Sequence, residues 1–179
     1  MVPGSEMLTS LVDAQGRKQA ALELLVRYIR IVDDPRRLAE WPDLFGDSAE
    51  YVVITRENHE RGLPIAVIRD DTKDRIIDRV TIIKNFWGAG GRAEDHHYNE
   101  SWPRHIVGPA WVEFTESGEA RLGANFAVYA TVQVDPEPRL LALGEYQDVV
   151  DFSDEIPKFK SKKVILDTSV LQDVFVYPL

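Results

Sequence analysis

Residues 121–132, with the sequence RLGANFAVYATV, decide the fold of this chain. Alternate residues in this stretch are apolar: Leu122, Ala124, Phe126, Val128, Ala130 and Val132. A spacing of two places side chains on one face of a strand, so the stretch predicts a strand with one buried face. Two more strand-like runs follow at 139–151 and 159–171, after the turn-rich segments 134–138 and 153–157. Runs joined by short turns pair antiparallel, so the sequence predicts a long, curved meander.

The residues before this meander predict two or three helices and a few short strands. Apolar residues recur at spacings of three and four in 17–32 and 36–44, which is typical of helices with one buried face. A third helix is expected after possible N-cap residues at 70–72. The remaining expectations are short strands at 51–55, 104–107 and 110–115, a loop at 56–62, and a bend at Gly108-Pro109. Helices followed by an antiparallel sheet predict an α+β domain with helices packed on one face of a curved sheet.

Length and composition favour one globular domain. The chain has 179 residues, of which 44% are hydrophobic and 28% are charged, and this suits a single sizeable core. Residues 1–16 are weakly patterned and are expected to form a flexible N-terminal arm. Residues 17–179 are expected to form the domain.

The charge and hydropathy of the chain disfavour several classes of partner. A net charge of −9 argues against nucleic-acid binding, because phosphate neutralisation requires clustered Lys and Arg. No stretch approaches the roughly 18 consecutive apolar residues of a membrane span. Residues 1–10 lack the basic region and apolar run of a secretory signal, so a cytoplasmic protein is expected.

The chain contains no cysteine. A disulfide framework, a thiolate nucleophile, a cysteine-ligated zinc ion and a cysteine-ligated iron–sulfur cluster are therefore excluded.

Histidines and carboxylates between residues 95 and 105 are the candidates for a metal site. The set contains Asp95, His96, His97, Glu100 and His105, which includes the two His and one carboxylate of a non-haem iron triad. However, adjacent histidines on a strand point to opposite faces, and no regular element brings these residues together. No metal ligand is therefore expected in this chain.

His105 lies inside an expected strand, directly after Trp102-Pro103-Arg104. On a curved sheet it could point into a cavity, where a histidine paired with a carboxylate acts as a general base. The alternative is a buried or interface histidine that is hydrogen-bonded to the backbone.

Charged residues of the last two strand-like runs give three further expectations. Glu145 and Asp148 are three residues apart, so they should lie on opposite faces of one strand. Asp167 lies among strand-forming residues and could be an inward charge paired with an Arg. The lysines at 158, 160, 162 and 163 favour a solvated strand edge, with an anionic docking site as the alternative.

Six short segments occur in an order and spacing that resembles the small (β) subunit of aromatic-ring-hydroxylating dioxygenases, from about residue 20 to residue 179. The segments are Tyr51-Val52-Val53, Arg56-Glu57-Asn58, Trp102-Pro103-Arg104-His105-Ile106, Ala124-Asn125-Phe126, Gly144-Glu145-Tyr146 and Val164-Ile165-Leu166-Asp167. The resemblance implies an NTF2-like, cystatin-like cone of helices on a long, mainly antiparallel mixed sheet. Glu145 departs from the basic residue that many members carry there, and this version looks closer to the branch whose substrates are single-ring aromatic acids.

The resemblance also implies the role of the chain. In this family the large (α) subunit holds the Rieske [2Fe-2S] cluster and the mononuclear Fe(II), and a ferredoxin and a reductase act on the complex. The small subunit would be non-catalytic, would hold no cofactor, and would form a trimeric base in an α3β3 assembly. Asn125, Tyr129, Glu145 and the lysines at 158–163 are the expected contact residues.

An alternative function is a free-standing enzyme of the same cone fold. Such a protein would be an isomerase, a dehydratase or a small-molecule binder that uses a cavity histidine. His105 with Asp43 or Tyr51 would be the candidates for proton transfer.

Overall fold

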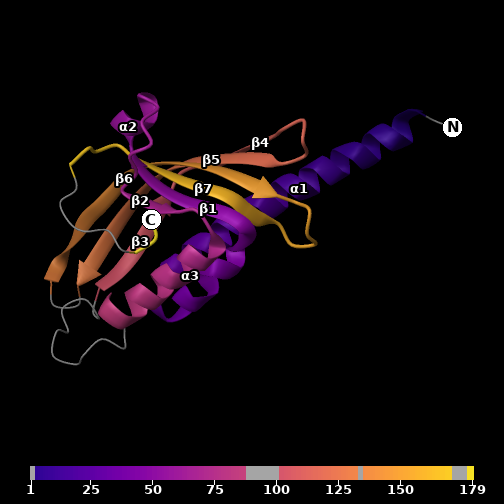
Figure 1. Cartoon of the computed structure of the whole chain (residues 1–179). Helices are drawn as coiled ribbons and strands as arrows, with labels where there is room; N and C mark the ends of the chain where they lie inside the picture. The colour runs from indigo at the N-terminus through magenta and orange to yellow at the C-terminus, as the bar shows by residue number, and fades with distance from the viewer. Residues whose placement is uncertain (1–2, 88–100, 133–134, 171–176) are drawn as a thin grey trace.

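The computed structural model describes residues 3–87, 101–132, 135–170 and 177–179 (Figure 1). The helical elements are α1 (Pro3–Val32), the 3-10 helix η1 (Pro35–Leu44), α2 (Arg56–Glu60), α3 (Lys73–Ile82) and the π-helical turn η2 (Ile83–Trp87). The strands are β1 (Phe45–Thr55), β2 (Ile68–Asp70), β3 (Ser101–Val107), β4 (Trp111–Phe114), β5 (Ala120–Val132), β6 (Asp135–Asp151) and β7 (Lys158–Leu166).

The described strands form one mixed sheet in the order β2-β1-β7-β6-β5-β3, with β4 also paired to β5. Strands β5, β6 and β7 pair antiparallel, which confirms the predicted meander. Strand β7 ends at Leu166, although the sequence pattern predicted a run to residue 171. Because β1 pairs parallel with β7, the meander is joined at one side to a strand from the first third of the chain.

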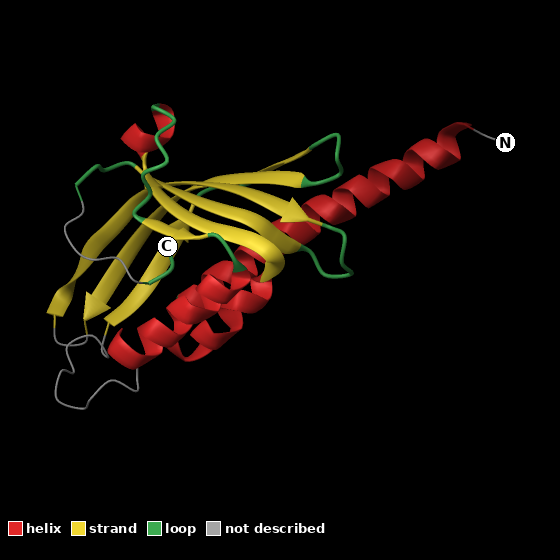
Figure 2. Cartoon of the chain, in the orientation of Figure 1, coloured by secondary structure: helices red, strands yellow, loops and turns green. Residues whose placement is uncertain are grey.

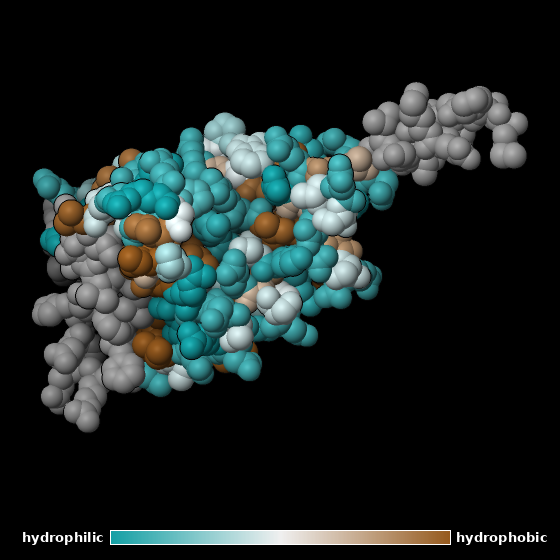
Figure 3. Space-filling view, turned by 45° about the horizontal axis from the view of Figure 1, so that its top comes forward, coloured by the Kyte–Doolittle hydropathy of each residue, from teal (hydrophilic) through white to brown (hydrophobic). Residues whose placement is uncertain are grey.

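The core lies between the sheet and the helices α1, η1 and α3, which pack on one side of it, whereas the short α2 lies apart from them (Figure 2). The alternate apolar residues of β5, including Leu122, Phe126 and Val128, are buried as predicted. Helix α1 contributes a buried stripe at spacings of three and four that includes Ala21, Leu25 and Tyr28. The visible surface is mainly hydrophilic and has separate apolar areas (Figure 3), as expected for a charged chain.

Helix α1 begins at Pro3, not near residue 17 as the apolar pattern predicted. Residues 3–16 therefore continue the helix, and Figure 1 shows this part of α1 projecting beyond the sheet. Extension of an existing helix adds one hydrogen bond per residue fixed, so a weakly patterned segment can remain helical. The flexibility of residues 1–16 stays a prediction.

Two connections between strands can be compared with the expectations from the sequence. The expected loop after β1 contains the short helix α2, whose N-cap is the side chain of Thr55, which accepts a hydrogen bond from the Asn58 N–H. The expected bend at Gly108-Pro109 is confirmed, because β3 and β4 pair with successive parts of β5 on either side of it.

Gly144 occupies a point in β6 where a side chain has no room. A Cβ atom there would overlap the carbonyl oxygen of Ile165, which belongs to the neighbouring strand and cannot rotate away. We expect Gly144→Ala to lower the free energy of unfolding by about 1–3 kcal/mol, the range of an overpacked core. Urea denaturation measures this. Gly16→Ala is the matched control, because Gly16 is exposed, lies within a helix and has nothing within 4 Å of an added Cβ. Equal stability of Gly144→Ala and the wild type would contradict the packing described.

Candidate functional site

The face of the sheet that packs on the helices carries a buried cluster of polar side chains. Its members come from α1, β1, β3, β6 and β7: Tyr28, Tyr51, His105, Tyr146, Asp148 and Lys162. A cone-shaped domain would hold a small molecule in this interior, so the contacts of these side chains decide what the interior can do.

Lys162 and Asp148 form a fully buried ion pair. Lys162 Nζ lies 2.9 Å from Asp148 Oδ2, and both side chains are 0% exposed. The ammonium also lies 3.7 Å from the centroid of the Tyr146 ring and 4.1 Å from that of Tyr28, so aromatic faces replace part of its water. Burial raises the pKa of Asp148 and lowers the pKa of Lys162, and in each case the partner's charge opposes the shift.

The predicted lysine edge at 158–163 is therefore wrong. Strand β7 lies inside the sheet, between β1 and β6. Lys162 points into the core, whereas Lys160 on the same strand is exposed and pairs with Glu119. The prediction that Glu145 and Asp148 lie on opposite faces is confirmed, since Asp148 is buried and Glu145 is partly exposed.

Three tyrosines surround this ion pair, and burial raises the pKa of Tyr28, Tyr51 and Tyr146 above 10.0. The Tyr28 hydroxyl donates to the carbonyl oxygen of Leu179 at 2.5 Å, and the Leu179 N–H donates to the Tyr51 hydroxyl at 2.9 Å. Leu179 is itself buried. The last residue of the sequence is thus held inside the domain by two tyrosines.

His105 pairs with Asp33, which follows the last residue of α1. The Nδ1 atom lies 2.7 Å from Asp33 Oδ1, and the backbone N–H of His105 donates to the same carboxylate at 3.1 Å. A carboxylate only accepts, so in the neutral imidazole Nδ1 carries the proton and Nε2 is an acceptor. Nε2 is buried and has no hydrogen-bond partner in the part of the chain that the structure describes.

The predicted partners of His105, Asp43 and Tyr51, are wrong. Asp43 is exposed at the end of η1, and Tyr51 is hydrogen-bonded to Leu179. Sequence reasoning missed Asp33 because it lies 72 residues from His105, just beyond the helical pattern of residues 17–32. The histidine does point into the interior, with a carboxylate that orients it, but its side chain is 0% exposed.

The interior is filled by the chain's own side chains. The rings of Phe126 and Tyr146 are stacked, with centroids 4.4 Å apart, and Tyr28 meets the edges of Tyr146 and Phe159. The His105 side chain is 0% exposed, so among the described residues this close packing leaves no room for a substrate beside it.

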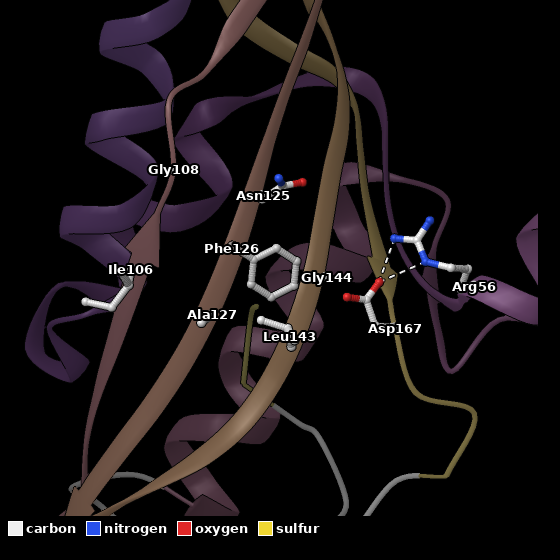
Figure 4. A pocket seen from close by; sticks show the side chains of 9 residues that line it. All are labelled: Arg56, Ile106, Gly108, Asn125, Phe126, Ala127, Leu143, Gly144 and Asp167. Atoms are coloured by element: carbon white, nitrogen blue, oxygen red, sulfur yellow. Dashed lines mark hydrogen bonds and ion pairs between the residues drawn. The ribbon is translucent and has the colours of Figure 1, made fainter.

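A pocket of about 380 Å³ lies on the opposite, outer face of the sheet (Figure 4). Its apolar lining comes from Ile106, Ala127 and Leu143, and the backbone around Gly144 forms part of the floor. Arg56 and Asp167 form one wall, where the Arg56 Nε and Nη2 atoms donate to Asp167 Oδ1 at 2.8 and 2.6 Å. Asp167 therefore has the expected arginine partner, but it lies exposed after the end of β7 and does not point inward. The pocket is open and has few polar groups that converge on a ligand.

No group of three or more histidines, aspartates or glutamates is placed to hold a metal ion within residues 3–87, 101–132, 135–170 and 177–179. Four of the five candidates at 95–105, namely Asp95, His96, His97 and Glu100, lie outside the described residues. Of the helices that the structure describes, none is long and apolar enough to cross a membrane.

A family model described as the ring hydroxylating beta subunit matches residues 29–173. The chain is 28% identical over 153 residues to the small subunit of anthranilate 1,2-dioxygenase from Burkholderia cepacia, with 86% of this chain and 88% of that protein covered. It is 24% identical over 152 residues to subunit beta 2 of the terminal oxygenase component of terephthalate 1,2-dioxygenase from Comamonas sp, with 85% and 92% covered.

Two solved structures from Novosphingobium aromaticivorans bear on the fold. A beta subunit assigned to the aromatic-ring-hydroxylating dioxygenases superposes with a TM-score of 0.75 at 31% identity, covering 92% of this chain and 97% of that one. An NTF2-like protein with a cystatin-like fold gives a TM-score of 0.65 at 14% identity, covering 93% and 91%. The predicted NTF2-like, cystatin-like architecture is confirmed.

Proposed function

This chain belongs to the family of ring-hydroxylating dioxygenase beta subunits, and from that premise we propose that it supports catalysis without an active site of its own. Membership makes the chain part of an oxidoreductase complex and implies a large-subunit partner. The proposal concerns what the small subunit contributes to that complex, which substrate the complex takes, and how many copies assemble.

The filled interior is the observation that carries the proposal. In a cone-shaped domain, substrate would enter beside His105, yet Tyr28, Tyr146 and Lys162 occupy this space and are at most 1% exposed. Leu179 adds a further buried side chain among them. The outer pocket is too open, and too poor in converging polar groups, to orient a small substrate.

The proposed contribution is geometric. A Rieske cluster requires cysteine ligands and the chain has no cysteine, so this cluster does not fit here and is proposed to lie in the large subunit together with the mononuclear Fe(II). A trimer of this chain would form the base of an α3β3 complex and hold neighbouring large subunits in register. A ferredoxin and a reductase would deliver electrons to the large subunits.

The proposed substrate class is a single-ring aromatic acid. The relatives reported above are named for anthranilate and terephthalate, which are both single aromatic rings with carboxylates. The Gly144-Glu145-Tyr146 segment supports the same branch.

A second candidate function rests on the His105–Asp33 pair. An oriented imidazole with a free Nε2 is the arrangement of a general base, and this favours a free-standing isomerase or dehydratase. The closed packing around His105 weighs against it, because a base must reach the proton that it removes.

The experiment separates the chain from its partner. We expect the chain purified alone to hold no stoichiometric iron and to leave anthranilate and terephthalate unchanged in the presence of reductant and O2. The same assays on the chain co-expressed with its large subunit should show iron and turnover. Turnover of these acids by the chain alone would overturn the proposal. An isomerase or dehydratase activity of the chain alone that needs neither reductant nor O2, and that is lost in His105→Asn, would instead establish the second candidate.

A further inference from the structure

Two rows of side chains cross the outer face of the sheet where the described part of the chain leaves it uncovered. Strand register places Leu143, Ala127 and Ile106 side by side across β6, β5 and β3, and Leu140, Tyr129 and Arg104 in the next row. Ile106 is 61% exposed, Leu140 is 50% exposed and Leu143 is 48% exposed. We call these two rows the outer patch. Large apolar side chains in contiguous rows are typical of a protein contact.

The chain itself covers the adjoining part of the same face. Val52 and Ile54 of β1 and Ile165 of β7 form a second small core, against which Ala66 packs from the segment after α2. Across the sheet, Ile165 is the register partner of Glu145 in β6, and Glu145 is that of Asn125 in β5. The pocket beside Arg56 lies where the covered part of the outer face ends. The buried apolar layer of the outer face therefore stops at β6, although the apolar surface continues to β3.

We propose that the outer patch is the contact through which copies of this chain join head to tail, with a side chain of the next copy in the pocket bordered by Arg56 and Asp167. The inference rests on the proposed trimer of small subunits and names its surface. A heterologous contact of this kind, repeated round a three-fold axis, closes into a ring.

Charges at the two ends of the outer patch identify a second copy as the occupant. At one end Arg104 is 58% exposed, whereas its neighbour Asp33 is only 13% exposed, so the surface presents a guanidinium. Arg36, which lies over the Trp102 ring, is paired with Asp34, but its guanidinium is 77% exposed and the carboxylate only 23%, so here too the cation is the more exposed partner.

At the other end the surface presents mainly acid. Glu145 and Asp167 both lie within 3.7 Å of a single Arg56, so two carboxylates share one guanidinium. The apolar rows lie between the two ends. The basic end of one copy is thus complementary to the acidic end of the next, which lets a chain of net charge −9 associate with itself.

The edge of the sheet is a poorer contact than its outer face. Strand β3 is the edge beside the patch, and it contains Pro103, which has no N–H to donate to a further strand. Copies should therefore meet face to face through side chains and not by extending the sheet.

Leu143→Asp tests the patch by placing a charge in its centre. We expect the dissociation constant of the small-subunit trimer to rise about 100-fold, the size of effect that a lost interface anchor produces. The measurement is mass photometry and sedimentation of the chain alone and of the complex with its large subunit. Ile77→Asp is the control, since Ile77 is similarly exposed but lies on α3, on the helical side of the sheet.

A charge exchange identifies the occupant. Arg104→Glu and Glu145→Arg should each weaken the trimer, and the double variant should recover it, because the two residues meet between identical copies. If the patch binds the large subunit instead, the double variant cannot recover the trimer. A double variant that does not recover it would therefore overturn the inference while leaving the proposed function intact. If Leu143→Asp left both the trimer and the complex unchanged, this result would also overturn the inference. If the wild-type chain bound no large subunit, that result would instead count against the proposed function. The effect of these variants on the trimer of the chain alone would still test the inference.

Discussion

Lys162→Ala is expected to lower the free energy of unfolding by about 3–5 kcal/mol, the cost of removing one partner of a buried ion pair. The substitution leaves Asp148 buried on β6 without the ammonium that now lies 2.9 Å from it. Asp148 Oδ1 has no hydrogen-bond partner among the described residues, so apart from the backbone N–H of Lys163 the carboxylate has little else to stabilise it. Urea denaturation at pH 7 measures the loss.

Two further variants make this result specific. Lys160→Ala removes a lysine two residues away that pairs with Glu119 at the surface, and we expect a change below about 1 kcal/mol. Lys162→Met combined with Asp148→Leu replaces the ion pair by apolar groups and should restore much of the stability. If Lys162→Ala were as stable as Lys160→Ala, the buried pair would not be present in the folded protein.

Alkaline pH is expected to destabilise the protein steeply. Burial raises the pKa of Tyr28, Tyr51 and Tyr146, so these hydroxyls keep their protons in the folded chain at pH values where the unfolded chain loses them. Their contribution is fully present below pH 10 and is lost as the pH rises from 10 toward the folded-state pKa values. Three such groups give a loss of about 4 kcal/mol between pH 9 and pH 11.

The titration of Lys162 changes the free energy of unfolding in the opposite direction over part of this pH range. Burial lowers its pKa, so below pH 10.5 the unfolded chain binds this proton more tightly and stability rises with pH. One lysine does not offset three tyrosines. Urea denaturation at pH 9, 10 and 11 is the measurement, and Tyr146→Phe should reduce the pH dependence by about a third. A free energy of unfolding that stays constant up to pH 11 would show that these tyrosines are accessible to water.

The fold could be predicted from the sequence where one physical signal was dominant. The alternation in β5 allowed a single arrangement, because a shift of one residue would expose Phe126 and Val128. The helix N-cap at Thr72 was also predictable, since its side chain accepts from the Arg75 N–H as expected of this residue type. The start of α1 was not, because the sequence of residues 3–16 is only weakly patterned.

The site could be predicted only in part, because it depends on pairs that are distant in the sequence. Four lysines within six residues suggested a solvated edge, yet the parallel pairing of β1 with β7 places this strand inside the sheet and Lys162 in the core. His105 was recognised as an inward-pointing histidine, but its partner Asp33 depends on where α1 ends in space. Such contacts leave no local trace in the sequence.

The assignment of Asn125, Tyr129 and Glu145 to a contact surface remains a prediction. Strand register places Asn125 beside Glu145, with Tyr129 further along β5, and all three lie on the outer face. This surface links the described fold to the proposed assembly, because the other face of the sheet is already occupied by helices.

The most direct test of the account is to measure iron content and aromatic-acid turnover in three samples: this chain alone, its large subunit alone, and the two together. The account predicts no stoichiometric iron and no turnover for this chain, iron in the large subunit, and full turnover in the α3β3 complex. Stoichiometric iron with oxygenase turnover in this chain alone would contradict the account.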